Sequence, residues 1–150
     1  MKRLLFVLLL CVLVGGSLAA EIRVALTPLG TSGDHHAQAV AVETTRALNQ
    51  ILSQLPRYEL GETSVPSGTS VNAGNAARFI NNNDFLVFGS VSQRGSETVI
   101  AIQAWSRAEQ QIVASYSGSI ASAFELFDAA EDAAVALMES LTGELIRFGE

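Results

Sequence analysis

The chain contains a single cysteine, and after its first twenty residues it contains no lysine. Cys11 lies inside an N-terminal apolar run, so the rest of the chain excludes disulfides, thiol catalysis and thiolate metal sites. The missing lysine excludes Schiff-base chemistry and a P-loop lysine. No Gly-x-Ser-x-Gly motif is present, and a serine hydrolase would depend on His35 or His36, the only histidines. We therefore predict that the protein is not an enzyme and has no cofactor.

Positive charge is also scarce. From residue 21 onward, seven arginines stand against fifteen acidic residues, which gives a formal charge of −8. A domain this acidic is repelled by the phosphates of nucleic acids and by anionic lipids. We therefore predict that the protein binds no nucleic acid.

The N-terminus has the pattern of a secretory signal. Two basic residues precede an apolar run from Leu4 to Val14, and small residues follow it. We predict cleavage after Ala19 or Ala20, so that residues 1–20 are a signal peptide and residues 21–150 form one domain. After this cleavage the protein is not expected to insert stably into a membrane.

Two other interpretations of the N-terminus fit its residues less well. The apolar run is shorter than the roughly 20 residues that a membrane span needs, so a retained anchor is the lesser alternative. Lipidation would require a small residue before Cys11 and an apolar run that ends there. Leu10 precedes it instead, and the run continues through Val12, so Cys11 is interpreted as part of the signal core.

Alternation and helical spacing predict eight elements after the signal. The expected strands cover residues 22–28, 57–63, 85–91, 98–106 and 112–120. The expected helices cover residues 34–54, with Asp34 as N-cap, a weaker segment at 71–82, and a last helix that follows a Ser122/Glu125 capping box.

The expected order βαβαβββα describes an α+β fold, an α/β sandwich. Residues 85–91 are apolar on both faces and are expected to form a central strand. Two right-handed crossovers place the first strand between the second and third. The predicted sheet is mixed and five-stranded, in the order 2-1-3-4-5, with helices packed on its faces.

Two buried faces are predicted from periodicity near the C-terminus. In the last helix, Phe124 and Phe127 begin an apolar stripe, and Asp128, Glu131 and Asp132 are expected on a solvated side. In the last strand, one face is expected to hold the following residues: Ile112, Ala114, Tyr116, Gly118 and Ile120.

Three segments resemble the N-terminal domain of TolB and the related CsgG/LpoB/FlgO-type domains of bacterial envelope proteins. Residues Ile22–Pro28 are similar to the family's V-A-hydrophobic-x-P opening. Residues Asn83–Val91 resemble its A-D-hydrophobic-hydrophobic-V-x-G-x-V strand, and Val99–Ser119 resembles the strand pair that follows. The spacing of Asp84 and Gly89 is the most distinctive part of the resemblance.

The resemblance implies a function that the residues alone do not reveal. It implies an exported, non-catalytic domain in the periplasm that binds another envelope protein as an adaptor or scaffold, with secretion as the alternative location. TolB carries a β-propeller after this domain. The resemblance covers most of residues 22–120, so no propeller-dependent activity is implied.

One alternative function is a small-ligand or anion-sensing domain. Gly30, Thr31, Ser32 and Gly33 form an expected loop at the switch point of the predicted sheet, where open α/β sheets bind ligands. The loop lacks the glycine pattern of phosphate-binding motifs, and a structural turn is the simpler interpretation.

Histidines and aromatic residues supply the remaining candidates. His35 and His36 are adjacent, so their side chains diverge by about 100° on a helix, and no metal site is predicted. Trp105 and Phe148 are candidate interface residues because aromatic side chains concentrate at binding hot spots. Core packing is the preferred interpretation of Trp105 and Tyr116, and Phe148 is the better exposed candidate.

Overall fold

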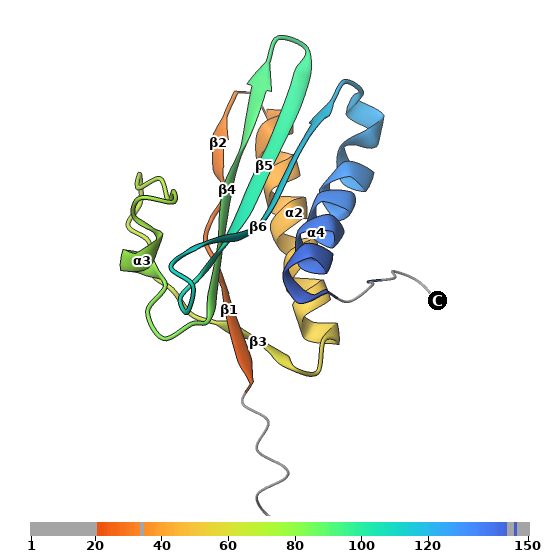
Figure 1. Ribbon diagram of the computed structural model, residues 1–150. Coiled ribbons are helices and arrows are strands. Elements are labelled where there is room, and N and C mark those ends of the chain that lie inside the picture. Colours follow the sequence, from red (N-terminus) through yellow and green to blue (C-terminus); the bar gives the residue numbers. More distant parts are fainter. Residues whose placement is uncertain (1–20, 34, 144–145, 147–150) are drawn as a thin grey trace, which may run out of the picture.

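The computed structural model describes residues 21–33, 35–143 and 146. The predicted signal peptide, the Asp34 cap and Phe148 lie outside the described residues. Within them, a twisted mixed sheet carries two long helices side by side on one face and one short helix on the other (Figure 1). No helix in this part of the chain is long and apolar enough to cross a membrane.

The elements are bounded as follows. The strands are β1 (Ile22–Leu26), β2 (Gly30–Ser32), β3 (Tyr58–Gly61), β4 (Phe85–Arg94), β5 (Glu97–Ser106) and β6 (Gln111–Ile120). The helices are α2 (His35–Gln54), α3 (Ala76–Phe79), the 3₁₀ turn η1 (Ala123–Glu125) and α4 (Leu126–Thr142).

The sheet runs β3-β1-β4-β5-β6, which is the predicted path for the five expected strands. The predicted number of strands is wrong, because the sheet has a sixth strand, β2, which pairs in parallel with β4. Leu26 pairs with Val87 and Gly30 pairs with Ser90, so β1 and β2 follow one another along the same edge of β4.

A short break separates β1 from β2. It contains Pro28, which has no backbone N–H to give to the sheet. Thr27 comes directly before Pro28. Both its backbone N–H and its hydroxyl donate to the Val87 carbonyl oxygen, each at 3.0 Å. The chain is thereby held against β4 across the break, and β2 resumes the pairing.

The main core lies between the sheet and the helices α2 and α4. The sheet contributes residues such as Val87, Val91 and Ile102, all essentially inaccessible. Helix α2 buries the face that helical spacing predicts, although Leu55 is only half-buried. Gly143 caps the C-terminal end of helix α4, and its N–H donates to the Glu139 carbonyl oxygen at 2.8 Å.

A smaller core lies on the opposite face. Leu86 and Phe88 of β4 pack there with Ala76 of α3, and Trp105 and Ile112 cover them partly. Strand β4 is thus buried on both faces near its start, as its continuous apolar sequence predicts.

The predicted helix over residues 71–82 is wrong in extent, since only Ala76–Phe79 is helical. Asparagine side chains hold the preceding residues in a turn. The Asn72 N–H donates to Asn75 Oδ1 at 2.8 Å, and the Gly74 N–H donates to Asn72 Oδ1 at 2.8 Å. Such bonds offer the backbone an alternative to the helix.

The predicted face of β6 is also wrong at its first residue. Ala104 pairs with Ala114 but Trp105 pairs with Ile112, so Val113 is an extra residue in a β-bulge. The bulge turns Ile112 toward the smaller core, whereas Ala114 and Ile120 join the main core.

Candidate functional site

Two phenylalanines near the start of α4 are exposed. Ser122 caps the η1 turn, accepting a hydrogen bond from the Phe124 N–H at 3.3 Å. Phe124 is then 96% exposed and Phe127 is 58% exposed. The prediction that both begin the buried stripe of the last helix is wrong.

Helical spacing gives the direction of a side chain but not what covers it. Phe127 lies on nearly the same side of α4 as the buried Ala134, seven residues later. At Phe127, however, the contact between α2 and α4 opens into a hollow of about 370 Å³ that His35, Gln38, Ala39, Val42, Glu43 and Phe127 line. The first turn of α4 is therefore only partly packed, since Leu126 is buried in the main core whereas Phe127 faces the hollow.

Val42 of α2 continues the same apolar surface and is 61% exposed. It lies between the hollow beside Phe127 and a second one, of about 450 Å³, formed with the connection from β1 to β2. Its neighbours Val40 and Ala41 are buried, so Val42 is the residue out of phase with the buried stripe. We call Ala39, Val42, Phe124 and Phe127 the helix-end surface.

Acidic residues accompany the helix-end surface. Glu43 lines the hollow with Phe127, Glu125 and Asp128 are chain neighbours of the two phenylalanines, and Glu131 and Asp132 follow in the next turn of α4. Glu125, Asp128 and Asp132 are exposed, and Glu43 and Glu131 are half-buried. We call these five carboxylates, with Arg46, the border. The expected solvated side of the last helix is therefore confirmed for Asp128 and Asp132, while Glu131 is partly covered.

The border contains one arginine, which is already engaged. Arg46 Nη2 lies 2.8 Å from Glu43 Oε2. The hydrogen bond to Glu43 and the charge of that carboxylate raise the pKa of Arg46, and Glu131 adds a smaller effect. The helix-end surface thus keeps an excess of negative charge.

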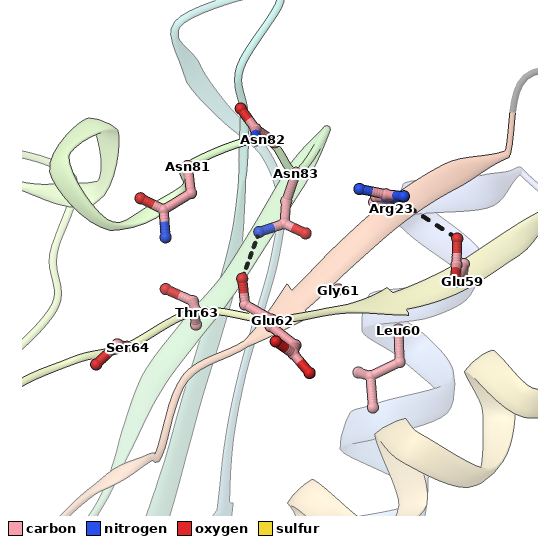
Figure 2. Close-up of a pocket in the computed structure, with 10 residues that line it drawn as sticks. All are labelled: Arg23, Glu59, Leu60, Gly61, Glu62, Thr63, Ser64, Asn81, Asn82 and Asn83. Carbon is pink, nitrogen blue, oxygen red and sulfur yellow. Dashed lines mark hydrogen bonds and ion pairs between the residues drawn. The ribbon is translucent and has the colours of Figure 1, made fainter.

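A larger polar hollow of about 890 Å³ lies beside β3 and the residues that follow it (Figure 2). Arg23 of β1 and Glu59 of β3 pair in register along one side of it and form an ion pair, with 3.6 Å between Nε and Oε2. Asn81, Asn82 and Asn83 contribute its other wall. Arg23 and Glu59 are about half exposed, so the hollow is open to solvent and does not isolate these charges from water.

Asn83 connects two segments that line this hollow. It is buried, and its amide nitrogen donates to the carbonyl oxygens of Glu62 at 3.0 Å and Ile80 at 2.8 Å. Its side chain rests on Gly61, where a Cβ would lie 2.7 Å from Asn83 Cγ. Asn83 therefore ties the end of β3 to the segment that enters β4, a structural role.

The predicted ligand loop is a strand. Gly30, Thr31 and Ser32 form β2, and they pair with β4 in the place where a switch-point crevice would open. Gly33 follows, and a Cβ on it would lie 2.8 Å from Gln93 Cβ. Ligand binding by these residues stays a prediction, but it would have to use the exposed side of a strand.

The histidines lie in the first turn of α2 and are exposed. Among the residues that the structure describes, no three His, Cys, Asp or Glu side chains lie close enough to hold a metal ion.

Trp105 is half-buried against the smaller core. Its indole nitrogen is buried and has no hydrogen-bond partner within the described part of the chain. Tyr116 is likewise partly buried, against the main core. Packing thus accounts for much of both rings, and an interface role for Trp105 stays a prediction.

No protein-family model and no curated protein matches the chain. Solved structures do match it. TolB from Acinetobacter baumannii matches with a TM-score of 0.59 and 15% identity, covering 86% of this chain and 30% of the TolB chain. The LpoB C-terminal domain from Escherichia coli matches with a TM-score of 0.48 and 15% identity over 71% of this chain and 87% of that one.

A further similar structure is the PelC dodecamer from Paraburkholderia phytofirmans, with a TM-score of 0.48 and 14% identity over 85% of this chain and 90% of that one. The fold resemblance stated from the sequence is therefore confirmed, since this chain has the fold of a part of TolB. The chain spans less than a third of TolB's length, and at this identity the likeness shows the fold alone.

Proposed function

We propose that this protein is an exported, non-catalytic domain of the bacterial cell envelope, located in the periplasm, that binds another envelope protein through the helix-end surface. The signal pattern in the sequence and the resemblance to envelope domains support the location. The exposure of Phe124 and Phe127 carries the assignment of the surface.

Exposed phenylalanines are unusual enough to need a reason. Burying one such side chain contributes roughly 1.5–3 kcal/mol, and aromatic anchors dominate the energy of protein interfaces. Among the described residues, the other large apolar side chains that are more than half exposed are Val42 and Leu60. Val42 and Phe127 line one hollow, and Phe124 lies three residues before Phe127 in the chain, so we group three of these four side chains as one surface.

A pull-down with matched variants tests this proposal. Tagged protein, expressed from the full sequence, is recovered from cross-linked envelope extract and analysed by quantitative mass spectrometry. The test variant is F124S/F127S, and the control is L60S, which removes an exposed apolar side chain from β3. All three proteins are expected to fold, because exposed substitutions change stability by only about 0.5 kcal/mol.

We expect one envelope protein to be enriched with the unmodified protein and with L60S, and to fall at least about tenfold with F124S/F127S, as for the loss of a hot spot. Equal recovery with F124S/F127S would overturn the assignment of the surface. Recovery of no partner by any form would overturn the adaptor function.

A further inference from the structure

The border of the helix-end surface points to the chemistry of what binds there. We infer that the bound segment of the partner protein carries apolar anchor side chains flanked by arginine or lysine. This inference rests on the proposed function and adds to it the class of partner.

The charge around the surface is one-sided. Five carboxylates belong to the border, Glu43, Glu125, Asp128, Glu131 and Asp132, and the one arginine among them is paired with Glu43. Complementary charge speeds association and suppresses wrong partners. A segment with basic residues beside its anchors would meet unneutralised carboxylates, whereas an acidic segment would meet repulsion.

The shape of the surface favours a segment with protruding side chains. Val42 stands between two hollows, of about 370 and 450 Å³, and Phe127 forms a wall of the smaller one. An extended or helical segment that lies across Val42 could place an apolar side chain in each hollow, which is how grooves commonly bind amphipathic segments.

The same charges argue against a second copy of this chain as the occupant. A symmetric dimer brings the same patch of each subunit together, so the carboxylates of Glu125, Asp128 and Asp132 would face their own copies. An anionic lipid surface would be repelled in the same way. A basic segment is the occupant that the charge favours.

Selection from a displayed library of random peptides tests the inference directly. The protein, expressed from the full sequence, is the bait, and F124S/F127S removes peptides that bind elsewhere. We expect the retained peptides to be rich in arginine, lysine and large apolar residues. Retained peptides that are neutral or acidic would overturn the inference and leave the proposed function standing.

Two charge variants of equal net charge sharpen the test. D128N/D132N neutralises part of the border, and E62Q/E109Q neutralises two exposed carboxylates, Glu62 just after β3 and Glu109 in the turn between β5 and β6. For a synthetic peptide from the selection, we expect D128N/D132N to weaken binding at least about fivefold at low salt and to reduce its salt dependence. We expect less than about a twofold change with E62Q/E109Q.

Other occupants of the helix-end surface would give different experimental results. Self-association in sedimentation that is lost in F124S/F127S, or binding to phosphatidylserine vesicles that the same variant abolishes, would overturn the inference in favour of a second copy or a membrane. Selected peptides whose binding ignores both phenylalanines would overturn the proposed surface together with the inference.

Discussion

Gly89 stands within β4 with the backbone of β5 pressed against it. A Cβ at this position would lie 2.8 Å from Ile102 Cα and 2.9 Å from Ile102 Cγ2, and it would overlap the carbonyl oxygen of Ala101. A glycine in a buried strand is expected to mark a close approach of this kind. The approaching group is the neighbouring strand itself.

We predict that Gly89→Ala lowers the free energy of unfolding by at least about 2 kcal/mol, since overpacking forces the backbone to move. Gly30→Ala is the matched control in the adjacent strand, where the nearest heavy atoms lie 3.8 Å from the position that a Cβ would occupy. It is expected to change stability by less than about 1 kcal/mol. Urea denaturation measures both, and equal effects would refute the steric argument.

The candidate site also depends on single residues, and only some of them could be identified from the sequence. Val42 could be identified as a surface residue, because it falls outside the helical phase of Val40, Ala41 and Thr44. Phe124 could not, because its exposure depends on the 3₁₀ turn that precedes α4. Periodicity alone did not show that Leu126, and not Phe124 or Phe127, is the buried residue at the start of α4.

Among the elements, β4 holds the sheet together. It pairs with β1 and then β2 on one side and with β5 along its whole length on the other. Helix α3 is only four residues long and is flanked by turns. The free energy needed to open these two elements locally should therefore differ greatly.

We predict that amide protons of β4 exchange with solvent at least about 100-fold more slowly than those of residues 76–79. Local opening free energies range from nearly zero in weakly packed segments to the global value in core strands. Hydrogen exchange read by mass spectrometry gives both sets in one experiment. Comparable protection of α3 would contradict the dominance of β4.

Long periodic elements were predicted well, whereas β2 was missed and α3 was predicted too long. Helix α2 follows its predicted stripe over five turns, because each buried residue repeats the same signal. Strand β2 has three small residues with no pattern of their own, and it becomes a strand because the edge of β4 is there to pair with. The length of α3 is limited by asparagine side chains, whose hydrogen bonds hold the preceding residues in a turn that helical periodicity does not predict.

At the scale of the whole molecule, the sequence predicted the order of the five expected strands because connection rules leave few alternatives. It did not predict the helix-end surface, because this surface is formed by two helices that are in contact in the structure but lie far apart in the sequence. Val42 and Phe127 line one hollow although 84 other residues separate them in the chain. Such a surface exists only once the helices are packed.

The proposed export of the protein can be tested by counting reactive amines, because the chain contains so little lysine. After residue 20 the chain has no lysine, so a protein cleaved after Ala19 or Ala20 has a single reactive amine at its new N-terminus. An uncleaved chain would have two, because it retains Lys2. We predict that protein from the envelope fraction has the mass of the cleaved chain and gains one dimethylated amine on reductive methylation.

The variant A19Q/A20Q replaces the small residues that signal peptidase requires, and we expect it to accumulate uncleaved with two methylated amines. Two amines in the unmodified protein would instead identify a retained N-terminal anchor. In that case the anchor would join the domain where β1 begins, and the helix-end surface would lie at the opposite end of the sheet, beside the start of α4, free for a basic protein segment (Figure 1).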